Sequence, residues 1–377
     1  MDFELSDEQM ALRDAARDLI AKRWDTAHLR RALDQGPARL SGEVWTELVA
    51  LGWVGIAVAE ERGGSGGDLL TAAVLAEEAG RGLLPGPFLS AVEAVCVVDR
   101  LGDAARDELV AELCAGTRRA TCAWEEPGGA WGPARPGTTV TDGTDTGAAS
   151  GGGDGLRVSG TKILVPDAEG ADLFVVSATR GDETVLVAVP AGEGVEIEAM
   201  RRFDGQDIAE VRFDVDVPAA ALLATGAEAV SGAYDLGTLL AAADLLGVAS
   251  AALDTTVAYA GQRVQFGRPI GSFQAIAHQL ADVAVDVEIA RSLVLAAALA
   301  ADDPEARDEA PALISAAKAW ASQTAVAACE TAVHVHGGIG FTWELDVHLW
   351  LRRARAGAVS FGDATHHQDR IGTGVLR

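Results

Sequence analysis

Asp244 is the residue whose type and setting first suggest chemistry in this 377-residue sequence. It is the lone carboxylate in AAADLLGVASAAL, an otherwise apolar run with helical periodicity. A carboxylate can act as a general base when it lies within hydrogen-bond reach of the proton that it removes. The alternative is an ordinary helix residue that faces solvent or a neighbouring helix, and the sequence leaves both interpretations open.

The cysteines and the adjacent histidines carry no metal or disulfide signature. No C-x-x-C pair occurs and the neighbours of each cysteine are apolar or helical, which predicts buried free thiols. His366 and His367 are adjacent, and adjacent helix residues do not share a face, so we expect a solvated surface there and no metal site. The cysteines are Cys96, Cys114, Cys122 and Cys329.

The charge balance excludes two classes of partner. The formal net charge of −26 would repel nucleic acid and anionic membrane surfaces, so neither is expected as a partner. The N-terminal segment is acidic and amphipathic without a basic region or apolar core, so no signal peptide is expected. No run reaches the ~18 uninterrupted apolar residues of a spanning helix. These features predict a cytoplasmic protein without a membrane span.

The pattern of residue types changes twice along the sequence, which predicts three domains. Residues 1–117 read as helices, beginning with a helix capped at Ser6 or Asp7. Residues 118–225 alternate β-branched and polar residues between turns, which indicates a small β-barrel or sandwich, with residues 142–155 as a flexible excursion between strands. Residues 226–377 return to long Ala/Leu-rich helices, which predict a four-helix bundle. The expected class is therefore α+β with several domains.

Four stretches are more specific than this pattern. They are YAGQRVQFGRPIGSFQ (259–274), HGGIGFTWELDVHLWLRR (336–353), GWVGIAVAEERGGSGG (52–67) and SGTKILVPDAEGADLFVVSA (159–178). Together they resemble the acyl-CoA dehydrogenase family, in the right order and over nearly the whole chain. The details look most similar to the actinobacterial branch associated with the degradation of sterols and other bulky acyl-CoA compounds.

The resemblance implies an oxidoreductase that binds FAD non-covalently between the subunits of a dimer or tetramer. It implies an acyl-CoA substrate oxidised between Cα and Cβ to the 2-enoyl-CoA, with hydride passing to flavin N5 and electrons leaving to an acceptor such as a flavoprotein. Arg263 stands where the family's arginine meets the FAD diphosphate, and a guanidinium fork suits a diphosphate. Gly337 and Gly338 would allow close approach to a neighbouring subunit's cofactor, or would simply end a helix. The remaining expected cofactor contacts are Phe266, Gln274 and His334, the last in place of the family's usual Gln.

Two segments of the middle domain depart from the family. The residues Leu164, Val165 and Pro166 replace a Trp-Ile-Thr or Trp-Ile-Ser sequence whose hydroxyl lies near flavin N5. Proline has neither a hydroxyl nor an N–H, so that hydrogen bond cannot form in the usual way. WEEPGG (124–129) similarly replaces T-E-P-G. We therefore expect unusual tuning of the flavin potential.

The family's catalytic glutamate is absent from both of its usual positions. They align with Gly237 and with Gly362 of the FGDA turn at residues 361–364. Asp244 lies about two helical turns after Gly237 and ~20° from the same face, which makes it our candidate base. Asp363 is the reserve candidate if the tail aligns one residue off.

Two alternatives to an independent dehydrogenase follow from the same residues. The chain could be the base-poor subunit of a hetero-oligomer with a paralogous chain, because both base positions are glycine. It could also be a flavin oxidase or monooxygenase of the same fold. FAD loading of the chain purified alone, and oxygen consumption without a CoA substrate, distinguish these alternatives.

Overall fold

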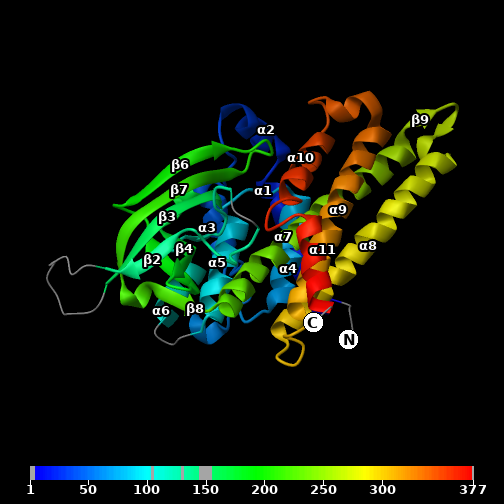
Figure 1. The fold of residues 1–377 in the computed structure, drawn as a ribbon. Helices are drawn as coiled ribbons and strands as arrows, with labels where there is room; N and C mark the ends of the chain where they lie inside the picture. Colours follow the sequence, from blue (N-terminus) through cyan, green and yellow to red (C-terminus); the bar gives the residue numbers. More distant parts are fainter. Residues whose placement is uncertain (1–4, 103–105, 129–130, 144–154, 376–377) are drawn as a thin grey trace. The chain divides into compact units, whose positions relative to one another are not determined.

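The computed structural model describes residues 5–102, 106–128, 131–143 and 155–375, in two compact units. The first unit contains residues 1–34, 69–84 and 238–377, and the second contains residues 35–68 and 85–237. The expected flexible excursion at 142–155 lies largely outside the described residues. The fold class predicted from the sequence is confirmed: helices, then a β region, then a helical bundle (Figure 1).

The first unit is helical. Helix α1 (Asp7–Arg23) begins at a capping box in which Ser6 Oγ accepts from the N–H of Gln9 and the Gln9 side chain accepts from the N–H of Ser6. Of the two expected caps, Ser6 and Asp7, the structure uses Ser6. It packs on α4 (Leu69–Arg81), which also contacts α8. The bundle consists of α7 (Ala227–Gln262), α8 (Gln274–Asp302), α9 (Ala310–His336), α10 (Val347–Gly357) and α11 (Ala364–Val375), and α2 (Thr26–Gln35) precedes it in the chain.

Helix α7 is long and apolar enough to cross a membrane by length and composition alone. However, 89% of its most apolar window is buried inside the protein. That burial is the pattern of a core helix. The division between the two units falls within α7, after residue 237.

The second unit is built on one mixed sheet of eight strands within the described residues. The strand order is β6-β7-β3-β2-β4-β5-β8, and β1 pairs in parallel with β4. Valines and Phe174 fill the core of the sheet, and α5 (Phe88–Arg100) packs on β1. Helices α3 (Gly42–Ala50) and α6 (Asp107–Cys114) complete the unit. The strands are β1 (Ala120–Ala123), β2 (Thr139–Asp142), β3 (Gly155–Pro166), β4 (Leu173–Arg180), β5 (Glu183–Pro190), β6 (Val195–Arg201), β7 (Asp207–Pro218) and β8 (Leu222–Thr225).

The secondary structure changes type close to the expected domain limits. Helix gives way to strand between Cys114 and Ala120, and strand to helix between Thr225 and Ala227. The two compact units do not follow the three expected domains, because residues 1–34 and 69–84 belong to the same unit as the C-terminal bundle. The division into three domains therefore stays a prediction. The four cysteines are buried free thiols, as expected.

Candidate functional site

Six predicted cofactor residues lie at one end of the bundle in the first unit. The chain leaves α7 at Gln262, turns through the short hairpin of β9 (Val264–Gln265) and β10 (Arg268–Pro269), and enters α8 at Gln274 (Figure 1). A small core of Ala260, Ile270, Leu280 and Val335 holds this end of α7 and α8 against the end of α9. The structure thus brings together Arg263, Phe266, Gln274, His334, Gly337 and Gly338.

The hairpin carries two exposed side chains, Arg263 and Phe266. Arg263 is exposed, and its guanidinium makes no ion pair or hydrogen bond with any described residue. Phe266 is 93% exposed at φ +51°, and its ring meets the edge of Phe273 at 6.1 Å between centroids. An unpaired arginine in so acidic a chain, beside an exposed aromatic ring, indicates a surface that contacts something outside this chain.

The end of α9 is equally open. Gly337 terminates α9 at φ +67°, so it is a helix cap whatever else it does. A Cβ added at Gly337 or Gly338 would meet nothing within 4 Å, and His334 is exposed. The ring of His336, buried at this end, stacks on Tyr259 at 4.2 Å, a contact that the sequence analysis missed.

This donor set fits FAD. A free guanidinium can pair with a diphosphate, and an amide and an imidazole stand beside it to hydrogen-bond polar groups. The exposed Phe266 and the open glycines leave room for an aromatic ring system or a second chain. The roles of the six residues nevertheless stay predictions.

Asp244 lies elsewhere, about 27 Å of helix before the end of α7. Asp244 is 5% exposed, and its carboxylate accepts two hydrogen bonds from Arg353 of α10, from Nε at 2.9 Å and from Nη2 at 2.8 Å. The structure therefore does not bring Asp244 together with the six residues of the hairpin end. Both oxygens are engaged, which suits an interhelical ion pair better than a free base. Its role as base stays a prediction.

Two glycines fix the backbone around Asp244. A Cβ at Gly80 of α4 would lie 2.0 Å from the carbonyl oxygen of Asp244, and one at Gly247 would lie 1.8 Å from the carbonyl oxygen of Glu77. Helices α4 and α7 therefore cross with their backbones in contact. Asp244 is held by this crossing on one side and by Arg353 on the other.

The turn that aligns with the family's base position has no room for a side chain at residue 362. Gly362 has φ +95°, and a Cβ there would lie 2.5 Å from His366 Cδ2. The fully buried Lys318 donates from Nζ to the carbonyl oxygen of Gly362 at 3.0 Å, to that of Ala358 at 3.3 Å and to Ser322 Oγ at 2.9 Å. Burial lowers the pKa of Lys318 to about 7.

Asp363, the reserve candidate, begins the last helix. Its Oδ1 accepts from the backbone N–H of His366 at 2.8 Å, so it caps α11. It also lines a cavity of about 390 Å³, together with Val326, Glu330 and Thr365 among others. This carboxylate is half-buried and borders open space, whereas Asp244 does not line this cavity.

The expectation of a solvated surface at the adjacent histidines is wrong for His367. Its side chain is fully buried because α11 packs on α9, and Nε2 lies 2.9 Å from the carbonyl oxygen of Phe361. Burial, reinforced by the charge of Lys318, lowers the pKa of His367 to about 3, so the ring is neutral. No cluster of three metal-ligating side chains occurs within the described residues.

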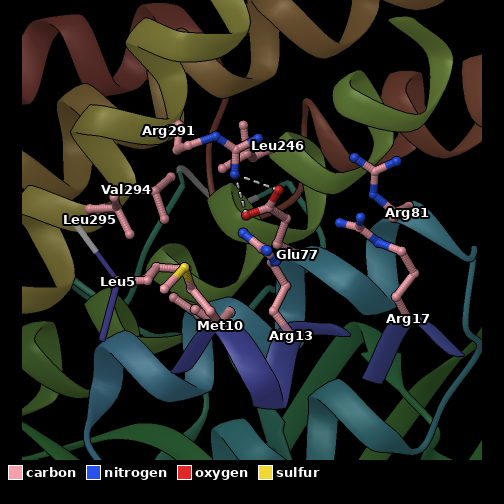
Figure 2. A pocket seen from close by; sticks show the side chains of 12 residues that line it. Leu5, Met10, Arg13, Arg17, Glu77, Arg81, Leu246, Arg291, Val294 and Leu295 are labelled. Carbon is pink, nitrogen blue, oxygen red and sulfur yellow. Dashed lines mark hydrogen bonds and ion pairs between the residues drawn. The ribbon is translucent and has the colours of Figure 1, made fainter. Parts of the chain in front are cut away.

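A second cavity, of about 440 Å³, lies among α1, α4, α7 and α8 (Figure 2). In Figure 2 the apolar Leu295 and Val294 lie on the left, and Arg291 enters from the same side. Arg17 and Arg81 lie on the right. Arg291 Nη1 donates to both oxygens of Glu77 at 2.6 and 2.7 Å, and Arg17 donates two hydrogen bonds to the carboxylate of Glu78. These carboxylates engage the arginines, so the cavity is bordered by ion pairs that join α1, α4 and α8.

Comparison with known proteins identifies the family. Residues 6–117 match the family model "Acyl-CoA dehydrogenase, N-terminal domain", and residues 224–376 match "Acyl-CoA dehydrogenase, C-terminal domain". The chain is 32% identical to the probable acyl-CoA dehydrogenase YngJ of Bacillus subtilis, over 98% of both chains. It is 31% identical to the acyl-CoA dehydrogenase IpdE2 of Mycobacterium tuberculosis, over 93% of this chain and 92% of that protein.

Solved structures agree. The Tcur3481–Tcur3483 steroid ACAD, in a glycine-to-alanine variant, superposes with a TM-score of 0.86 at 32% identity, with 98% of each chain covered. The ChsE4–ChsE5 complex of Mycobacterium tuberculosis superposes with a TM-score of 0.88 at 27% identity, with 100% of this chain and 99% of that chain covered. The chain belongs to the acyl-CoA dehydrogenase family, whose FAD-dependent enzymes oxidise acyl-CoA thioesters.

Proposed function

We propose that this dehydrogenase oxidises a bulky, steroid-derived acyl-CoA, with FAD held at the hairpin end of the bundle between two chains. The unpaired guanidinium of Arg263 supports the placement, because an exposed cation without a partner in an acidic chain is available to a diphosphate. The named steroid ACAD among the similar structures supports the substrate class. A cytoplasmic location is part of this proposal.

The second chain at the proposed FAD site is either a further copy of this chain or a paralogous subunit. The Tcur3481–Tcur3483 and ChsE4–ChsE5 proteins are each named for two components, which supports a hetero-oligomer as well as a homo-oligomer. A separate electron-transferring flavoprotein is proposed to take the electrons. Flavin content of the chain purified alone distinguishes the two assemblies: about one FAD per chain supports the homo-oligomer, and empty sites support a paralogous partner.

When bound, FAD supplies the acceptor for the hydride that leaves Cβ. The chain must supply a carboxylate that removes the Cα proton. Asp244 can do so if Arg353 releases one of its oxygens, since both now accept hydrogen bonds. Asp363 is favoured by a different observation, its position at the edge of a cavity.

Anaerobic bleaching of the flavin tests the proposal. We would mix the flavin-loaded protein with a steroid side-chain CoA thioester and with straight-chain acyl-CoAs, and follow absorbance near ~450 nm. The proposal expects fastest bleaching with the steroid thioester, and equal or faster bleaching with a straight chain would reject the substrate class.

The same assay assigns the base. Asp244→Asn and Asp363→Asn are compared at equal FAD content. Binding of the acyl-CoA to each variant is measured in parallel. The variant that retains FAD and binds the acyl-CoA but loses bleaching by a hundredfold or more identifies the base. If both variants bleach at the wild-type rate, neither residue is the base.

A further inference from the structure

The cavity among α1, α4, α7 and α8 combines an apolar lining with a cationic one. Its volume of about 440 Å³ lies within the range of sites for small organic molecules. All of its lining residues belong to the first compact unit, and it shares none of them with the six hairpin-end residues or with the cavity beside Asp363. The apolar lining residues include Leu5, Met10, Val74, Leu246, Val294 and Leu295.

Two of the lining arginines share one buried carboxylate. Arg17 Nη2 lies 2.7 Å from Glu78 Oε1, and Arg81 Nε lies 3.8 Å from Glu78 Oε2. The side chain of Glu78 is 0% exposed. In Figure 2 the side chains of Arg17 and Arg81 lie next to each other on the right. Two positive charges therefore meet a single buried negative charge on this part of the cavity.

The other counter-charges of the arginines lie mostly in water. Arg291 pairs with Glu77, whose side chain is 11% exposed, and at 3.6 Å with Glu288, whose side chain is 72% exposed. Exposed ion pairs are weak because water and salt screen them. Four guanidinium groups therefore border the cavity opposite two buried carboxylates, those of Glu77 and Glu78. The remaining pairs are Arg13–Asp14 and Arg81–Asp254, in which each carboxylate side chain is 65% exposed.

The arginines also keep N–H groups that the described residues leave unused. Arg17 donates to Glu78 from Nε and Nη2, and its Nη1 donates to no described residue. Arg81 donates to Asp254 from Nη1, and its buried Nε makes no hydrogen bond within the described part of the chain. A guanidinium with free N–H groups forms strong, charge-assisted hydrogen bonds to a carboxylate.

We propose that this cavity binds the anion of a carboxylic acid with an apolar body. The carboxylate would pair with Arg17 and Arg81, and the apolar body would lie against Val294 and Leu295. A chain with a net charge of −26 repels anions at long range, so a site for one requires a local excess of positive charge such as this. The proposal goes beyond acyl-CoA oxidation and needs no turnover, so its failure would leave the proposed substrate and base untouched.

The test is isothermal titration calorimetry of the flavin-loaded, full-length protein with octanoate, 1-octanol and acetate. Octanol has the apolar body without the charge, and acetate has the charge without the apolar body. We expect octanoate to bind at least about tenfold more tightly than either, because the site uses both features. Octanol that binds as tightly as octanoate, or the absence of octanoate binding, would overturn the proposal.

Two variants show whether octanoate occupies this cavity. Arg17→Gln removes one guanidinium, and octanoate should then bind about tenfold or more weakly. Its matched control is Arg31→Gln, at an exposed arginine of α2 that does not line the cavity. Val294→Phe fills the apolar part and keeps the test decisive if Arg17→Gln does not fold. Val285→Phe, at a position of α8 that is 59% exposed, is its control.

The proposal expects weaker octanoate binding in the two cavity variants and wild-type binding in the two controls. Octanoate affinity that stays unchanged in either folded cavity variant would place the ligand elsewhere, for example in the acyl-CoA site. That result would overturn the proposal.

Discussion

Two buried carboxylates, one from each compact unit, are satisfied in different ways. Asp244 in the first unit is 5% exposed and Glu93 in the second unit is 4% exposed. Asp244 accepts a two-point hydrogen bond from the guanidinium of Arg353. Glu93 accepts from the indole N–H of Trp124 and the thiol of Cys122, and neither donor carries a charge.

This difference leaves the Glu93 carboxylate without a counter-charge among its hydrogen-bond donors. Neutral donors offset only part of the cost of removing a carboxylate from water. Burial accordingly raises the pKa of Glu93 to about 7. A guanidinium opposite the carboxylate supplies a full counter-charge, so Asp244 and Arg353 behave as one structural unit. Similar burial therefore does not place two acids in the same electrostatic environment.

The largest expected effect is the removal of the cation from Asp244. Arg353→Met leaves a buried carboxylate without its counter-charge, and we expect a loss of about 3–5 kcal/mol in the free energy of unfolding. Urea denaturation measures the loss. The matched control is Arg355→Gln on the same helix, because Arg355 pairs with Glu330 at the surface and should contribute at most about 1 kcal/mol.

A double variant shows whether the loss comes from the stranded charge. Asp244→Leu combined with Arg353→Met replaces the pair by apolar side chains, and should recover most of the stability lost in Arg353→Met alone. If the double variant is as unstable as the single one, lost packing rather than charge explains the effect. The comparison between the two acids would then fail.

The next effect in size is a pH dependence from Glu93. Its pKa is higher in the folded protein than the 4.5 of the free side chain, so the folded state binds more protons between these values. The contribution of Glu93 to the free energy of unfolding should therefore be fully present below pH 4.5. It should fall by roughly 3 kcal/mol as the pH rises to 7 and beyond. Glu93→Gln should remove this fall and be the more stable protein at pH 8, as measured by urea denaturation.

The control for this prediction is Glu108→Gln, at an exposed position on α6. It should follow the wild-type stability at pH 5 and at pH 8. A Glu93→Gln variant whose difference from the wild type is the same at both pH values would show that Glu93 does not titrate in this range.

Local signals in the sequence predicted most of the fold. The cap at Ser6 appears in the structure, and the long Ala/Leu-rich helices expected after residue 225 begin with α7 at Ala227. Such signals depend on neighbours in the sequence. The burial of His367 and Lys318 depends instead on how α11 and the turn before it pack on α9, which no local pattern encodes.

In the candidate site, too, local motifs were predictable from the sequence and contacts between distant residues were not. The hairpin residues share one continuous motif, so the motif alone placed Arg263 and Gln274 near each other. The pairs Asp244–Arg353 and Glu77–Arg291 each join residues more than a hundred positions apart. Nothing in the sequence around Asp244 shows that an arginine of α10 would reach it. The close crossing at Gly80 and Gly247 also becomes visible only in the structure.

The smallest expected effect on stability belongs to Arg263, the opposite of Arg353. Arg263 is exposed and has no partner among the described residues, so Arg263→Gln should change the free energy of unfolding by no more than about 0.5 kcal/mol. Its FAD affinity should fall about ten- to a hundredfold, because a charge-assisted hydrogen bond contributes about 1.5–3 kcal/mol. Arg268→Gln, on the same hairpin but stacked on Phe273, is the control and should retain FAD. Equal FAD loss in both variants would mean that the hairpin fold, and not the Arg263 charge, holds the cofactor.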